Sequence, residues 1–96
     1  MNLIDKANLA QDADFRAKVQ TAVIKSSADL LNDGSQEFIT HQFAKHVRNN
    51  IGGNWLNIFV QMVVRDITSA TPEDVDIVNA INGNYFTVAK EFYRNI

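Results

Sequence analysis

Residues 12–34 read DADFRAKVQTAVIKSSADLLNDG and contain the clearest helical pattern of the chain. Side chains suited to a buried face recur every three or four positions, at Phe15, Val19, Ala22, Val23, Ser26 and Leu30. Asp12 and Asp14 stand at the start, where carboxylates satisfy free N–H groups and the positive end of a helix. Asn32-Asp33-Gly34 follows, and glycine readily adopts the left-handed conformation that closes a helix. The stretch predicts a long amphipathic helix.

Shorter apolar segments lie on either side of this helix. Residues 2–10 predict a leading helix of one or two turns, which is marginal alone and must dock on the rest. After the long helix, Ser35 opens a third segment with Gln36 and Glu37 in its first turn. Gly52-Gly53 ends this segment. Its apolar stripe consists of Phe38, Ile39, Phe43, Ala44, Val47 and Ile51.

The fourth segment is the one place where a strand competes with a helix. Asn54 is its cap, and several of its residues are β-branched, which favours strands. However, its apolar residues do not alternate strictly, and a single strand would lack a partner in a helical chain. Their spacing predicts a buried helix instead, with Trp55, Ile58, Phe59, Met62, Val63 and Ile67 on one face.

The last segment starts with Thr71 as a cap and Pro72 at the first helical position, where a missing N–H costs nothing. Its apolar stripe, Ile77, Ile81, Tyr85, Val88 and Phe92, advances by 4, 4, 3 and 4 residues. The stripe crosses Asn82-Gly83-Asn84 without losing phase, and those three residues fall off it. We therefore expect one helix from residue 72 to about 93, weakened or bent near Gly83.

The composition fits an all-α single domain spanning residues 1–96, a compact bundle of four main helices with a short N-terminal helix. The 96 residues are 46% hydrophobic, and 9 Lys+Arg stand against 11 Asp+Glu. This balance argues against disorder and lacks the basic surplus that nucleic-acid binding needs. The absence of cysteine excludes disulfides and thiolate chemistry. Apolar runs are too short to cross a bilayer, and no signal-peptide pattern follows Met1.

No group of residues predicts an active site. His41 and His46 are five apart and do not share a helix face, so we expect no metal site. Asp74 and Asp76 lie in the first turns of a helix, where the helix dipole explains them. No nucleophile elbow or phosphate-binding glycine motif occurs. We therefore predict that the protein is not an enzyme, with no catalytic, cofactor-binding or metal-binding residues and no cofactor.

The apolar surplus predicts protein–protein contact. The helix from Trp55 to Ile67 is apolar on more than one face, because Val60 and Val64 lie off its main stripe. Either part of this helix faces another subunit, or it is the central helix of the chain's own bundle. The predicted interface anchors are Trp55, Val60, Val64, Phe86 and Tyr93.

Several motifs follow one another along most of the chain. The first is Leu9-Ala-Gln-Asp12-x-x-Phe15-x-x-x-Val19-x-x-Ala22-Val-Ile-Lys25. A middle helix with His41-x-x-x-Lys45 and a core helix with Phe59-x-x-x-Val63-Val64 follow. The chain closes with Asp74-Val-Asp76-Ile77-x-x-x-Ile81-Asn82, then Tyr85 and Ala89. Together they resemble a family of small proteins encoded among the virion-structure genes of tailed bacteriophages, often near the major capsid gene. The sequence departs from that family at Gly83 and Asn84 and in the aromatic tail ending Phe92-Tyr93.

The resemblance implies a structural or assembly role in a phage particle and offers no catalytic residues. We expect a homo-oligomer or contacts with other virion proteins, in the virion or the host cytoplasm, with no membrane contact, and nucleic acid is a disfavoured partner. A small helical regulator that binds a host protein is the alternative, and one that binds nucleic acid is less favoured.

Overall fold

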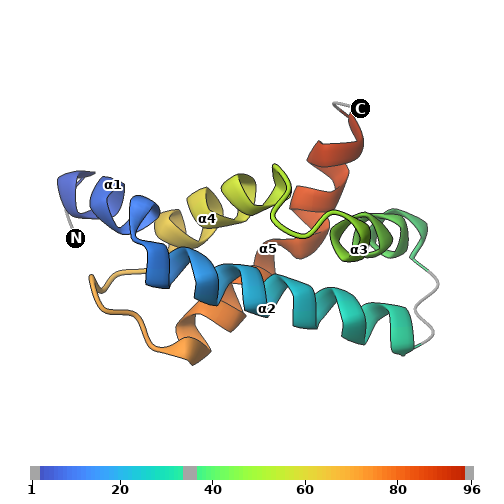
Figure 1. The fold of residues 1–96 in the computed structure, drawn as a ribbon, viewed down its shortest axis with the longest axis horizontal. Helices are drawn as coiled ribbons and strands as arrows, with labels where there is room; N and C mark the ends of the chain where they lie inside the picture. The colour runs from blue at the N-terminus through green and yellow to red at the C-terminus, as the bar shows by residue number, and fades with distance from the viewer. Residues whose placement is uncertain (1–2, 34–36, 95–96) are drawn as a thin grey trace.

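The structure is a computed structural model that describes residues 3–33 and 37–94, without the side chains of residues 3, 4, 93 and 94. Its described part consists of a short helix and four longer ones packed together, as the sequence predicts (Figure 1). The helices are α1 (Leu3–Gln11), α2 (Ala13–Asn32), α3 (Phe38–Asn49), α4 (Trp55–Asp66) and α5 (Asp74–Arg94). The prediction of a helix rather than a strand after Asn54 is therefore confirmed. The prediction that the last helix continues through Gly83 is confirmed as well.

The long second helix begins and ends at the residues that the sequence predicts as its caps. The Asp12 carboxylate accepts a hydrogen bond from the Phe15 backbone N–H at 2.8 Å, and the Asp33 N–H donates to the Asp29 carbonyl at 3.0 Å. The buried face differs from the predicted stripe, since Ser27 is buried while Ala22, Ser26 and Leu30 are only half-buried. The Ser27 hydroxyl is satisfied there because it donates to the Val23 carbonyl at 2.8 Å.

The third helix is shorter than expected at both ends. Glu37 is its N-cap rather than part of its first turn, because its carboxylate accepts from the Ile39 N–H at 2.9 Å. The expected cap, Ser35, lies outside the described residues. At the other end the chain leaves the helix after Asn49, and Gly52 takes a left-handed conformation with φ 78°. Phe38 and Ile51 are therefore 70% and 63% exposed, and the prediction that they belong to the buried stripe is wrong.

The starts of α4 and α5 also differ from expectation. Asn54 precedes α4 but its side chain makes no capping hydrogen bond. The last helix begins at Asp74, two residues after the predicted Pro72. The reason is local, because the Asp76 carboxylate accepts a hydrogen bond from the Glu73 N–H at 3.1 Å and caps the helix there. The Thr71 N–H instead donates to the Ser69 hydroxyl at 3.1 Å. Neither Thr71 nor Pro72 lies inside the helix.

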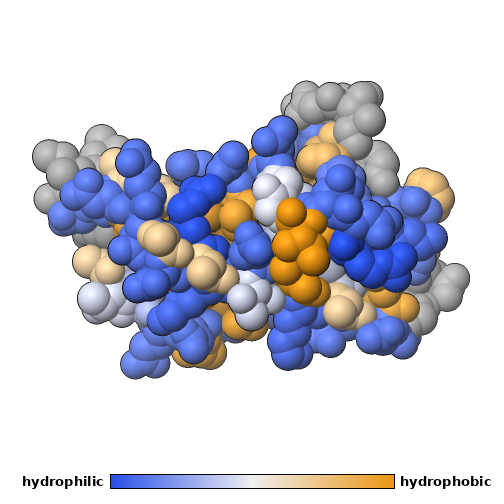
Figure 2. Space-filling view, viewed as in Figure 1, coloured by the Kyte–Doolittle hydropathy of each residue, from blue (hydrophilic) through white to orange (hydrophobic). Residues whose placement is uncertain are grey.

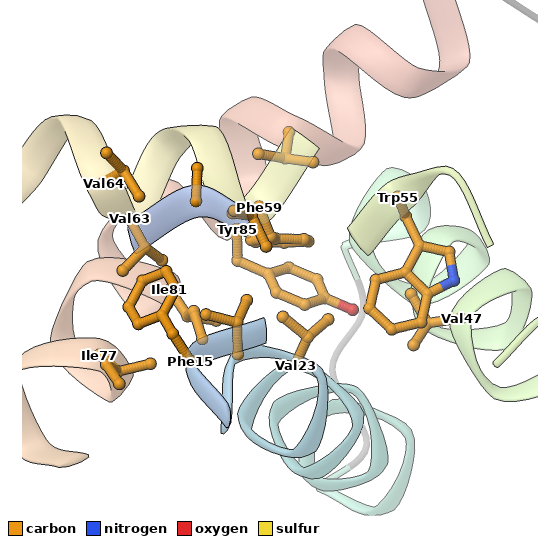
Figure 3. Close-up of a cluster of buried hydrophobic side chains, with 14 of the residues drawn as sticks. Phe15, Val23, Val47, Trp55, Phe59, Val63, Val64, Ile77, Ile81 and Tyr85 are labelled. Atoms are coloured by element: carbon orange, nitrogen blue, oxygen red, sulfur yellow. The ribbon is translucent and has the colours of Figure 1, made fainter. Parts of the chain in front are cut away.

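The core lies between α2, α4 and α5, with α3 closing one end (Figure 3). Phe15 and Val23 of α2 face Val63 of α4 and Ile81 of α5 across it. At the α3 end an aromatic cluster surrounds Phe43, whose ring centroid lies 5.5 Å from Tyr85, 5.3 Å from Phe92 and 6.1 Å from Phe59. Such edge-to-face and tilted pairs add to the stabilisation from burial.

The short first helix docks on α4 and α2, as its length requires. Its last turn buries Ala10, and the Arg16 guanidinium donates to the Ala10 carbonyl at 3.0 Å. The Lys6 ammonium donates to the Arg65 carbonyl at the end of α4, at 3.3 Å. In Figure 1, α1 and α4 lie along the upper side of α2, while α5 passes behind it.

Candidate protein–protein interface

The structure distributes the five predicted interface anchors unevenly. Trp55 and Val60 are fully buried and Val64 is 5% exposed, all three inside the chain's own core. In this fold they present no surface to a partner, which corresponds to the second interpretation of α4, a helix central to its own bundle. Phe86 is 47% exposed on α5. The Tyr93 side chain lies outside the described residues.

The exposed apolar surface of the described residues gathers on α5. Of the large hydrophobic side chains that are exposed, Val75, Val78 and Phe86 belong to this helix. The face shown in Figure 2 has mainly separate hydrophobic residues among hydrophilic ones, which is normal for a protein surface. If the outer side of α5 faced only solvent, it would not need three exposed apolar side chains.

Five residues of α5 follow one another at a four-residue spacing. Asp74, Val78, Asn82, Phe86 and Lys90 form a row, which we call the α5 ridge, that turns about 40° around the helix at each step, so that it starts on the side toward α2 at Asp74 and ends on nearly the opposite side at Lys90. All five are exposed. The Lys90 ammonium lies 5.2 Å from the centre of the Phe86 ring, within range of a cation–π contact.

The α5 ridge borders a groove between α2 and α5. Two hollows of about 530 and 330 Å³ share Ala22, Lys25 and Val78 and therefore form one depression, here called the α2–α5 groove. The α2 wall has four small side chains, Ala17, Thr21, Ala22 and Ser26, between larger and charged ones. Small side chains let another chain approach the backbone closely, so the groove suits a protein partner rather than a compact ligand.

Two hydrogen-bonded pairs lie at the groove, one across it and one beneath it. Ser26 donates to the Asn82 side-chain oxygen at 3.1 Å and joins the two walls at their midpoint. Beneath it, the Tyr85 hydroxyl lies 2.7 Å from the Ser27 hydroxyl. Because the Ser27 proton goes to the Val23 carbonyl, the neutral phenol donates to Ser27. Burial raises the pKa of Tyr85 to about 12, so the phenol stays neutral at physiological pH.

Charges lie along the rim of the groove. Lys18 on α2 pairs with Asp74 on α5 at 3.5 Å, and Lys25 pairs with Asp29 at 3.1 Å. All four side chains are more than half exposed, so these pairs stabilise the fold little. Asp33 lines the far end of the groove. A rim of charges around apolar side chains is the usual anatomy of a protein interface.

A second polar cluster, outside the groove, connects the end of α4 to α5. Asn84 is buried, although the sequence pattern placed it off the apolar stripe, because its polar atoms have partners. Its amide nitrogen donates to Asp66 and to the Ala80 carbonyl, both at 2.7 Å, and its oxygen accepts from Arg65 at 2.8 Å. The Arg65 guanidinium, helped by the Asn84 amide, lowers the pKa of the Asp66 carboxyl. This cluster joins two helices.

The two histidines are both partly buried on α3. His46 stacks against Phe43 with ring centroids 6.4 Å apart and lies tilted against Phe92 at 4.5 Å, and His41 is half-buried on the same helix. Within residues 3–33 and 37–94, no three His, Cys, Asp or Glu side chains lie close enough together to hold a metal ion. In that same part of the chain, none of the helices has the length and apolar character needed to span a membrane.

The sequence pattern singled out the buried side of α5 and, as interface anchors on this helix, Phe86 and Tyr93, of which only the Phe86 side chain is among the described ones. Val78 and Val75 escape it because a buried stripe and an exposed one have the same helical period, and only packing distinguishes them. The four-residue spacing from Asp74 to Lys90 was the available signal. No model of a known protein family matches this chain, and neither a curated protein nor a solved structure is significantly similar to it.

Proposed function

We propose that this protein is a non-enzymatic structural or assembly protein that acts through protein–protein contacts and associates with copies of itself. The observation that carries the proposal is the α5 ridge, where Val78 is 39% and Phe86 47% exposed beside an open groove. Covering such side chains removes apolar surface from water, at about 25 cal/mol per Å².

The surroundings of the ridge support association rather than ligand binding. The groove is open to solvent and shared between two helices, and its polar groups are either paired across it or arranged on its rim. A small-molecule site would instead converge a few polar groups in a deep pocket. A contact with another protein would cover the exposed apolar side chains of this surface and face the charges on its rim.

The resemblance of the motifs from Leu9 to Ala89 supports a phage particle as the setting of this role. Mass spectrometry of purified particles tests it, with the protein expected at a stable ratio to the major capsid protein. Absence from particles, with capture of a host protein instead, would favour a small helical regulator.

Sedimentation analysis of the whole chain tests self-association directly. We expect a dimer or larger species at high micromolar concentration, dissociating on dilution, because two exposed apolar side chains support a weak contact rather than a permanent one. A strict monomer across the concentration range would overturn self-association.

A further inference from the structure

We propose that Asn82 is a modification site that α5 keeps unreactive, where the side-chain amide is lost through a succinimide with Gly83 only in chains whose α5 has opened. The modified chain then cannot rebuild α5 as one continuous helix. This inference does not depend on the proposed self-association. It concerns a pair of residues, Asn82-Gly83, that lies off the apolar stripe and whose glycine the packing does not require.

The pair has the chemistry that this reaction needs. Asn82 is the one asparagine of the chain that is followed by glycine. Glycine has no Cβ, so its backbone nitrogen reaches the preceding side chain with the least steric hindrance. In an unfolded chain, Asn82 is therefore the asparagine from which we expect the fastest loss of the amide.

The reaction conserves its atoms and involves no oxidation or reduction. The Gly83 nitrogen forms a bond to Cγ of Asn82, and the side-chain nitrogen leaves as ammonia with the proton that the Gly83 nitrogen gives up. Water then adds to one of the two carbonyl carbons of the succinimide and breaks its bond to the Gly83 nitrogen. One opening leaves aspartate, and the other leaves isoaspartate, in which the main chain runs through the side-chain carbon.

The helical backbone prevents the first of these steps. Residues 82 and 83 lie inside α5, which runs from Asp74 to Arg94. In an α-helix the N–H of residue 83 is directed to the carbonyl four residues earlier, so the nucleophilic nitrogen is occupied. Closing the ring also requires ψ of Asn82 to leave its helical value of about −42°. Attack therefore needs the helix to open at this point.

The side chain of Asn82 is held as well, although solvent reaches it. Ser26 of α2 donates to its oxygen at 3.1 Å, which holds the amide against the neighbouring helix. Asn82 and Gly83 are both exposed, so the access of water does not limit the reaction. Protection at this site comes from conformation rather than from burial.

Opening α5 at Asn82 disrupts the core, because its neighbours on both sides are buried. Ile81 is fully buried and Tyr85 is 5% exposed, and both belong to the main cluster. Asn84, 7% exposed, is bonded to Asp66 and Arg65. The site therefore reacts only in the small fraction of molecules in which this part of the core has opened. We expect at least a hundredfold slowing in the folded protein, which corresponds to about 2.8 kcal/mol of opening free energy.

The product makes such an opening permanent. Isoaspartate adds a carbon to the main chain, so the hydrogen bonds of α5 cannot continue in register past residue 82. The two halves of the helix carry Ile77 and Ile81 on one side and Tyr85 and Val88 on the other, all buried in the folded chain. A chain with isoaspartate at this position therefore should not regain the native core.

Peptide mapping by mass spectrometry tests the protection. The whole chain is incubated at mildly alkaline pH, folded in buffer or unfolded in guanidinium chloride, and digested with trypsin. The tryptic peptide of residues 66–90 contains both Asn82 and Asn79, and Asn79 precedes alanine on the same helix and is the internal control. We expect conversion to the acid at Asn82 in the unfolded sample, little at Asn79, and at least a hundredfold less at Asn82 in the folded sample. Conversion of Asn82 in the folded protein at nearly the unfolded rate would overturn the proposal, as would equal conversion of Asn79 and Asn82 in the unfolded chain.

Gly83→Ala tests the route and its consequence. Compared in guanidinium chloride, where both chains are unfolded, the variant should lose the Asn82 amide about tenfold more slowly, because the alanine Cβ hinders the attacking nitrogen. After long incubation and removal of the denaturant, the natural chain should refold in a yield that falls as isoaspartate accumulates, while the variant keeps its yield. An equal loss of yield in both chains, or natural chains with isoaspartate that recover the native circular dichroism spectrum, would overturn the claim that the modification prevents refolding.

Discussion

Tyr85 combines two roles at the level of a single residue. Its ring belongs to the aromatic cluster around Phe43, with centroids 5.5 Å apart, and its hydroxyl reaches Ser27 at the floor of the groove. Burial disfavours the phenolate, which raises the pKa from 10.0 to about 12. In the unfolded chain the same group titrates near 10, so the two states bind protons differently between these values.

The sign of the pH effect follows from this difference. The raised pKa contributes stability that is fully present below pH 10 and is lost as the pH rises through about 12. Tyr85→Phe should therefore reduce the fall in unfolding free energy over this range, by up to about 3 kcal/mol. Below pH 10 it should cost about 1 kcal/mol, from the lost bond to Ser27. Urea unfolding of both proteins below pH 10 and near pH 12 measures this. Equal pH dependence would contradict it.

At the level of the element, α5 contains a glycine, Gly83, that the packing of the chain does not require. A Cβ built at Gly83 would meet nothing within 4 Å, so no close approach within the chain requires glycine there. Gly52 differs, because its φ of 78° is one that side chains with a Cβ adopt at a cost.

These two glycines give opposite predictions. Gly83→Ala should stabilise the fold by about 0.5–1 kcal/mol, since alanine restricts the unfolded chain and favours the helix. Gly52→Ala should destabilise it by about 1 kcal/mol through backbone strain. Thermal unfolding followed by circular dichroism compares the two with the natural chain. A lower melting temperature for Gly83→Ala would show that this position has a contact the chain alone does not reveal.

The helices could be predicted from the sequence, but not all of their ends. Periodicity fixed α2, α4 and the continuity of α5, because an apolar stripe persists over many turns and averages out local exceptions. The ends depend on single hydrogen bonds, such as Glu37 to Ile39 and Asp76 to Glu73, which compete with equally plausible caps at Ser35 and Thr71. Only the positions of the atoms show which bond forms.

At the level of the whole molecule, the core depends on one aromatic centre. Phe43 is fully buried and its ring contacts come from α3, α4 and α5. Phe43→Ala should cost about 3–5 kcal/mol, a large part of the 5–15 kcal/mol that holds a typical domain together. Chemical denaturation should show an earlier midpoint or loss of cooperativity. Phe38→Ala is the control, because Phe38 is 70% exposed and should change little. Comparable losses in both variants would remove Phe43 from this central position.

The candidate interface was predictable only in part. A hydrophobic fraction of 46% indicates more apolar surface than a small bundle easily hides, and Phe86 follows from that argument. Trp55, Val60 and Val64 look equally suitable in sequence, yet the fold packs all three inside. Which helix keeps an apolar side exposed is decided by how the five helices pack, and periodicity carries no information on that choice.

The buried Trp55 also provides an intrinsic fluorescence probe of folding. It is the one tryptophan of the chain, its side chain is fully buried, and its indole N–H donates to the Asn50 carbonyl at 2.7 Å. Its emission should therefore be blue-shifted in the native protein and move to the red when the turn before α4 leaves the core. Because Trp55 is not among the residues of the α2–α5 groove, the signal should be silent to dimer formation. Fluorescence can then follow unfolding alone, in the same samples in which sedimentation follows association.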